Sequence, residues 1–186
     1  MATNRTMNYF TRYVLDLDQE GRHAVWCNMD FSLKELVLGS NRIPSFSSLY
    51  ILRTNENDGK PFYVGETSIG LRRNLQEFRL AGSSFRTWRN EYSNQRIFAD
   101  HYVFGNISMQ ERQCRRYLEA AIIERFKEYV RNKTKQIPRD KKYHINDCIV
   151  QECIKFVEKT VTMSRCMMIG NEQCCCLTLF DNSFGA

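Results

Sequence analysis

The sequence predicts an α/β protein with a small antiparallel or mixed three-stranded sheet flanked by helices, with N- and C-terminal extensions. Two β-rich runs, 49–52 and 62–64, flank Asp58-Gly59, a dipeptide typical of hairpin turns. A third run, 101–104, precedes a long stretch with helical apolar spacing. The order strand, strand, helix, helix, strand, helix therefore predicts a small α/β sandwich.

The composition is that of a globular protein. The chain has 186 residues, of which 42% are hydrophobic and 26% charged, which is room for about one domain. No run approaches the ~18 apolar residues of a membrane span, and the polar, charged start is unlike a signal peptide. Eight cysteines without such a signal predict free thiols in a reducing, intracellular compartment, nucleus or cytoplasm.

Breaks in periodicity divide the chain into three segments. Residues 1–46 form an N-terminal extension, because the stretch 39–45 contains Gly, Asn and Pro, which interrupt both regular periods. Residues 47–146 form the central domain. Residues 147–186 form a C-terminal extension with a helix over 147–158 and an irregular cysteine-containing end.

The hairpin places two tyrosines on one face. A loop centred on residues 58 and 59 predicts that Tyr50 faces Thr67 and that Tyr63 faces Thr54. Side chains alternate along a strand, so both tyrosines project to the same side of the sheet.

Helices supply the charged candidates. Thr67 or Ser68 can cap the first helix, on which Arg73 lies opposite the apolar stripe. A short helix is expected over 85–92. Ser108 can cap a long helix over 109–130. Glu119 lies about 100° from the apolar stripe of that helix.

Residues 47–130 resemble the GIY-YIG nuclease domain. The strand 48–50, Ser-Leu-Tyr, stands where the family has a Gly-Ile-Tyr-like strand, and 63–65, Tyr-Val-Gly, matches its Tyr-(Ile/Val)-Gly motif. Arg73 follows that glycine by eight residues, as in the family. Residues 119–123, Glu-Ala-Ala-Ile-Ile, match the family's glutamate-bearing helix.

The resemblance implies hydrolysis of nucleic-acid phosphodiesters with one divalent metal, Mg²⁺ or Mn²⁺. Glu119 would hold the ion through one carboxylate oxygen, and the guanidinium of Arg73 would match the phosphate oxygens. Tyr50 and Tyr63 would hydrogen-bond the attacking water or the phosphate. A phenol has a pKa near 10, roughly, so a base role for Tyr50 requires the metal and Arg73 to lower that pKa.

Two positions depart from the family pattern. Ser48 replaces the first glycine, and Glu77 takes the position where the family often has His or Tyr, which makes Tyr50 the leading base candidate. The family also has an asparagine beyond the glutamate, and both Asn132 and Asn146 fit in part. The substrate-binding candidates are Gly65, Arg72, Asn132 and Asn146.

Basic residues flank the expected site. Between 72 and 96 there are six arginines against two glutamates, and between 112 and 142 there are eleven basic against four acidic residues. We therefore expect a nucleic-acid partner, DNA before RNA, and no membrane. The first hypothesis is a metal-dependent DNA endonuclease. The alternatives are a catalytically impaired nucleic-acid-binding module of the same fold, and an interaction protein with scattered basic residues. A homodimer stays open, because one site cuts one strand at a time.

Overall fold

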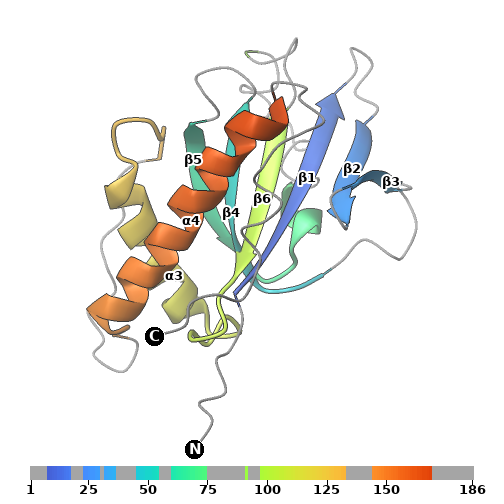
Figure 1. Cartoon of the computed structure of the whole chain (residues 1–186). Helices are drawn as coiled ribbons and strands as arrows, with labels where there is room; N and C mark the ends of the chain where they lie inside the picture. The colour runs from blue at the N-terminus through green and yellow to red at the C-terminus, as the bar shows by residue number, and fades with distance from the viewer. Residues whose placement is uncertain are drawn as a thin grey trace, which may run out of the picture.

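The computed structural model describes residues 8–17, 23–29, 32–36, 45–54, 60–74, 91, 97–132 and 144–168. Figure 1 shows a single sheet with two helices, α3 and α4, packed beside it. The sheet has six strands in the order β3-β2-β1-β6-β4-β5, and every neighbouring pair is antiparallel. The elements are β1 (Tyr9–Leu17), β2 (His23–Met29), β3 (Ser32–Leu36), β4 (Ser48–Thr54), β5 (Pro61–Thr67), β6 (Ile97–Val103), α3 (Arg112–Arg125) and α4 (Asp147–Met168).

The α/β class is confirmed, but the prediction of three strands was wrong. The predicted strands are β4, β5 and β6, and β1, β2 and β3 join them in the same sheet. The reason is that β6 is an interior strand, whose backbone N–H and C=O groups need hydrogen-bond partners on both sides. It pairs with β4 on one side and with β1 on the other, where Tyr13 faces Ala99. The expected boundary at residue 46 falls between β3 and β4 of one sheet.

β4 and β5 pair with each other as predicted, but in a register that differs from the predicted one. Tyr50 faces Gly65 and Leu52 faces Tyr63, which is two residues away from the predicted pairing. The register is irregular between Leu52 and Arg53, which shifts where β5 begins. A shift of two preserves the face of every side chain. Tyr50 and Tyr63 therefore lie on one face, as predicted, with ring centroids 6.0 Å apart.

The opposite face of the sheet carries the main apolar core. Leu49 and Ile51 of β4 belong to one buried cluster with Leu118 and Ile122 of α3 and Val157 of α4. Each such side chain contributes roughly 1.5–3 kcal/mol on burial. This packing fixes α3 against the sheet, and with it the position of Glu119.

The bounds of α3 and α4 differ from the expected ones. The long helix is shorter than 109–130, because a turn over 126–129 follows α3. Ser108 was wrong as its cap: the cap residue is Glu111, whose backbone N–H bonds Ser108 O at 3.0 Å. The predicted 147–158 helix is confirmed and runs ten residues further.

Several expectations lie outside the described residues. They include the helix over 85–92 except position 91, the irregular tail 169–186, and Glu77. Residues 71–74 are helical, with Leu71 buried and Arg73 exposed, so Arg73 faces away from the apolar side as predicted. Within the described ranges, no helix combines the length and apolar character needed to cross a bilayer.

A buried ionic cluster joins three strands. Arg12 of β1 donates from Nε and Nη2 to the two oxygens of Asp100 at 2.7 and 3.1 Å, and Arg53 of β4 also donates to Asp100 Oδ2. All three residues are buried. Burial would raise the pKa of Asp100, but the charges and hydrogen bonds of Arg12 and Arg53 outweigh it, and the pKa is lowered. The carboxylate therefore stays ionised inside the sheet.

Candidate functional site

Tyr50 lies at the centre of the candidate site and is seated on a glycine. Its neighbour across the β4–β5 pair is Gly65. A Cβ atom at position 65 would lie 2.5 Å from the Tyr50 hydroxyl oxygen and 2.8 Å from Cε1, distances that real Cβ atoms do not show. Gly65 is therefore required by the close approach of the Tyr50 ring. Its predicted place among the substrate-binding residues becomes a structural role in positioning Tyr50.

Tyr63 lies beside Tyr50 on the same face. The two rings are tilted by 31°, and hydrogen bonding with the Tyr63 side chain is one of the causes that raise the pKa of Tyr50. This hydrogen bonding therefore favours the protonated phenol. Tyr50 is 3% exposed, whereas Tyr63 is half-buried. Tyr63 is thus the phenol that incoming molecules can reach.

Two opposite charges act on Tyr50. Burial raises its pKa most, Tyr63 raises it further, Arg73 lowers it and Glu119 raises it, and the result lies well above 10.0. Tyr50 therefore keeps its proton at neutral pH and acts as a hydrogen-bond donor. The sequence-based hypothesis made a base role for Tyr50 depend on a metal as well as on Arg73; in the structure, burial, Tyr63 and Glu119 together outweigh Arg73.

The four predicted catalytic residues thus gather from four elements: β4, β5, the helical turn at 71–74 and α3. We call Tyr50, Tyr63, Arg73 and Glu119 the Tyr50 cluster. Within this cluster Glu119 is 1% exposed, whereas Arg73 is exposed. Among the described residues, no group of three His, Cys, Asp or Glu side chains gathers around a common point.

A pair of arginines fixes α3 over β5 close to the cluster. Arg115 is 3% exposed and donates from Nε to Glu66 Oε2 at 2.9 Å. Arg112 donates to the other oxygen of Glu66 at 3.2 Å. Glu66 follows Gly65 in the chain, and Arg115 precedes Glu119 by one helical turn. The ion pair therefore sets the position of Glu119 relative to the tyrosines.

His101 was missed as a site residue. It lies within β6, is 1% exposed, and stacks on Tyr50 with ring centroids 5.7 Å apart and 29° between planes. Its Nδ1 is 2.9 Å from Ser48 Oγ, and its Nε2 is 2.8 Å from Asn74 Oδ1. Burial lowers its pKa to about 3, although Asp100 acts to raise it. The ring is therefore neutral.

The hydrogen bonds define the tautomer. Because Asn74 Oδ1 only accepts, Nε2 carries the hydrogen, and Nδ1 accepts from the Ser48 hydroxyl. The hydroxyl of Ser48 thereby orients the His101 ring.

The Ser48-His101-Asn74 arrangement has the composition of a nucleophile, base and orienting group. Its burial excludes that role. Ser48 and Asn74 are both 0% exposed, so no substrate reaches the hydroxyl. The three residues form a scaffold around Tyr50.

The two candidate asparagines both have structural roles. The Asn132 side chain accepts from Val64 N–H at 2.8 Å and donates to Val64 O at 2.6 Å, which completes the edge of β5. Asn146 accepts from the N–H of Cys148 at 2.8 Å, at the start of α4. Neither amide is therefore directed at substrate. Arg72 is exposed beside Arg73.

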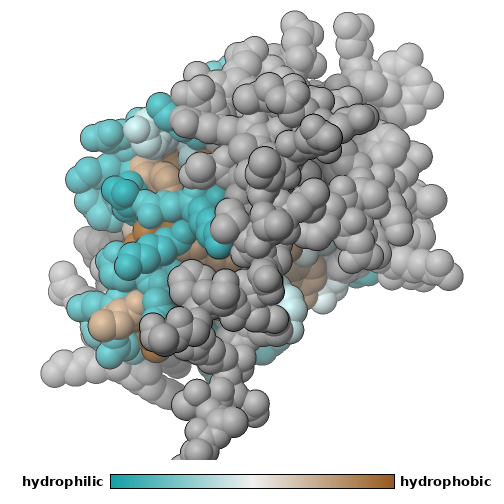
Figure 2. Space-filling model, in the orientation of Figure 1, coloured by the Kyte–Doolittle hydropathy of each residue, from teal (hydrophilic) through white to brown (hydrophobic). Residues whose placement is uncertain are grey.

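The side of the molecule carrying α3 and α4 is mostly hydrophilic, with apolar patches among the polar side chains (Figure 2). The exposed arginines include Arg72 and Arg73 in the helical turn and Arg112, Arg116 and Arg125 on α3.

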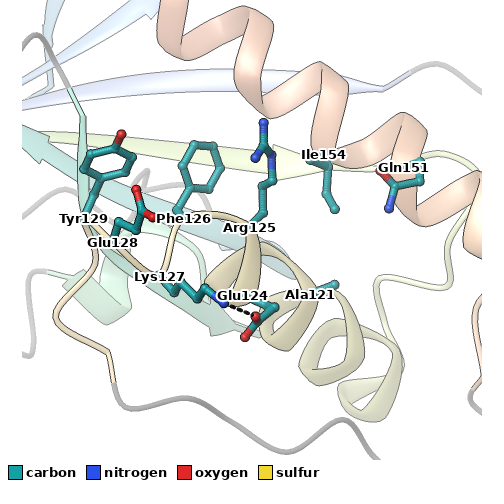
Figure 3. A pocket seen from close by; sticks show the side chains of 9 residues that line it. All are labelled: Ala121, Glu124, Arg125, Phe126, Lys127, Glu128, Tyr129, Gln151 and Ile154. Carbon is teal, nitrogen blue, oxygen red and sulfur yellow. Dashed lines mark hydrogen bonds and ion pairs between the residues drawn. The ribbon is translucent and has the colours of Figure 1, made fainter.

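A pocket lies between the end of α3 and α4 (Figure 3). It is lined by charges of both signs. Lys127 donates to Glu124 at 2.8 Å, and Arg125 donates to Glu158 at 2.6 Å. Because basic groups are paired with acidic ones, the pocket concentrates no positive charge for a polyanion. None of the residues that line it belongs to the Tyr50 cluster.

The Tyr50 cluster is therefore the candidate site that the fold offers, held by Gly65, His101 and Arg115. Comparison with known proteins finds no matching family model, no matching curated protein and no matching solved structure.

Proposed function

We propose that the protein is a metal-dependent endonuclease that hydrolyses DNA phosphodiester bonds at the Tyr50 cluster. The observation that supports this is the meeting of two phenols, a guanidinium and a carboxylate, seen in the action of Arg73, Glu119 and Tyr63 on Tyr50. Phosphodiester hydrolysis needs an anion to hold a metal, a cation for the phosphate and donors for its oxygens. The cluster contains one group of each kind.

Arg73 and Tyr63 make the first contacts with substrate, because they are the more exposed members of the Tyr50 cluster. The planar guanidinium of Arg73 matches two phosphate oxygens and remains charged throughout. Tyr50, with its proton retained, donates a hydrogen bond to a phosphate oxygen or to the attacking water. Removal of a proton from that water falls to a group other than Tyr50.

Glu119 is the metal candidate. A single carboxylate fits Mg²⁺ or Mn²⁺, which keep several waters and take a substrate phosphate oxygen as a further ligand. When bound, the ion supplies charge that stabilises the departing oxygen. Since Glu119 is closed to solvent, we expect metal binding to be weak without nucleic acid and stronger with it.

The exposed arginines supply the DNA contacts. Arg72 and Arg116 are exposed near Arg73 and on α3. Each phosphate that such a group neutralises makes binding fall with salt, by a slope of roughly 0.9 per contact on logarithmic axes.

A second candidate is a nucleic-acid-binding module of the same fold that has lost cleavage. The burial of Glu119 and the raised pKa of Tyr50 favour it, because both oppose metal uptake and proton abstraction.

A plasmid-nicking assay with Mg²⁺ or Mn²⁺, and with EDTA as blank, tests the proposal. We expect metal-dependent nicking by the wild type and a loss of roughly 10²-fold or more in Glu119→Gln and Arg73→Ala. The matched controls are Glu124→Gln, an exposed carboxylate on the same helix, and Lys155→Ala, an exposed cation on α4 that is not among the proposed DNA contacts. They should keep their cleavage rate.

The outcomes separate the hypotheses. Nicking that Glu119→Gln and Arg73→Ala both retain would refute the site. Salt-sensitive DNA binding without nicking selects the binding module, and no binding at low salt removes both candidates.

A further inference from the structure

His101 lies between two parts of the Tyr50 cluster. On one side it stacks on Tyr50, its direct partner across the β4–β6 pair. On the other side it bonds Asn74, which directly follows Arg73 in the helical turn. A third contact, to Ser48, reaches the strand that carries Tyr50 two residues before it.

We infer that His101 is a positioning residue for the proposed hydrolysis: the imidazole, anchored by Ser48 and Asn74, holds the hydroxyl of Tyr50 in place. The inference rests on the proposed function, because it assigns His101 a role in that reaction.

The Tyr50 ring is confined from both neighbouring strands. Gly65 of β5 leaves no room on one side for more than a hydrogen atom, and the imidazole of His101 on β6 stacks on the other. A tyrosine has only two side-chain torsions, so two such neighbours define where the hydroxyl lies. Removing the imidazole frees the ring to tilt toward β6.

The imidazole is itself held in one orientation. Both ring nitrogens have a partner, and a half-turn of the ring would exchange each nitrogen for a carbon. The hydrogen bond to Asn74 ties the imidazole to the turn at 71–74, where Asn74 is fully buried and Arg73 is exposed. Since His101 is buried, it acts through shape and hydrogen bonds and transfers no proton to substrate.

A double-mutant cycle on Tyr50 and His101 tests the inference. His101→Phe keeps an aromatic ring and removes both hydrogen bonds. We expect it to lower the single-turnover cleavage rate by on the order of tenfold, because small misplacements of reacting groups reduce rates that much or more. DNA affinity should stay within about twofold of the wild type, since Arg72 and Arg116 are untouched.

The decisive comparison is made in a Tyr50→Phe background. If His101 acts through the Tyr50 hydroxyl, adding His101→Phe there lowers the rate by less than about twofold. Equal losses in both backgrounds would overturn the inference. His101→Gln, which retains one amide donor, serves if the phenylalanine variant does not fold, and should lose less activity than His101→Phe.

Tyr102→Phe is the matched control. Tyr102 is the next residue on β6, is 0% exposed, points to the opposite face, and bonds Thr160 of α4 at 2.7 Å. The Tyr102→Phe variant should lose thermal stability and keep its cleavage rate, which separates an effect on positioning from an effect on stability. If the wild type does not cleave, the proposed function fails and this inference fails with it. If it cleaves and the cycle is additive, only the inference fails.

Discussion

Acidification to pH 5 should destabilise the protein through a single buried histidine. Burial lowers the pKa of His101 from 6.5 to about 3, so the folded protein does not bind the proton that the unfolded chain takes up. Stability is therefore complete above pH 6.5 and is lost as pH falls toward 3. At pH 5 the loss is about 2 kcal/mol relative to pH 7.5, and it approaches roughly 4–5 kcal/mol near pH 3.

The pH window separates this effect from that of Asp100. The pKa of Asp100 is lowered from 3.8, so its contribution is lost only as pH falls below that value. Between pH 7.5 and 5, Asp100 is ionised in both folded and unfolded chains and contributes no slope. Asp100 therefore adds nothing to the change that His101 produces in that interval.

Urea unfolding at pH 7.5, 6.5, 5.5 and 5.0 measures the effect. The wild type should lose about 2 kcal/mol of unfolding free energy over this range, and His101→Gln should lose correspondingly less. A wild-type stability that does not change between pH 7.5 and 5, or an equal slope in His101→Gln, would refute the reasoning.

Three further substitutions have defined outcomes. Gly65→Ala should displace Tyr50, abolish nicking and cost about 1–3 kcal/mol of stability by overpacking, as measured by thermal unfolding and plasmid assay. Asp100→Asn should cost about 3–5 kcal/mol in urea unfolding, because two buried guanidinium groups lose their counter-charge; a loss below 1 kcal/mol, roughly, would contradict this. Tyr102→Phe should cost about 1 kcal/mol of stability. Thr160 Oγ1 keeps the hydrogen bond that it donates to Val157 O and loses only the one that it accepts from Tyr102.

The hairpin shows what spacing alone can predict. The common face of Tyr50 and Tyr63 followed from the two-residue period of a strand, and it survived a register error of two. The register itself depended on where the loop is centred, and the irregularity after Leu52 moved it. Parity along a strand is therefore more predictable than the pairing partner.

β1 was not predicted as a strand because burial on both of its faces removes the alternating signal. β1 buries Arg12 toward Asp100 on one face and Tyr13 toward His101 on the other. With both faces inside, polar and apolar residues do not alternate between water and core. An arginine reads as exposed in sequence, and only a partner 88 residues away shows otherwise.

His101 was missed for a similar reason. Its role depends on Ser48, 53 residues earlier, and Asn74, 27 residues earlier, and no local pattern connects the three. The spacing of Tyr50 and Arg73 along the chain carries no information on which residues hold them in place. The supporting contacts are long-range, so they appear only once the sheet is assembled.

The position of β1 has a consequence for cutting the chain down. A fragment beginning at residue 45 would keep every member of the Tyr50 cluster, yet it would leave β6 with a bare edge of unpaired peptide groups. It would also remove Arg12, so that Asp100 would retain the guanidinium of Arg53 alone among those shown here. Such a fragment should aggregate through strand addition at β6, whereas in the longer chain β1 pairs with that edge.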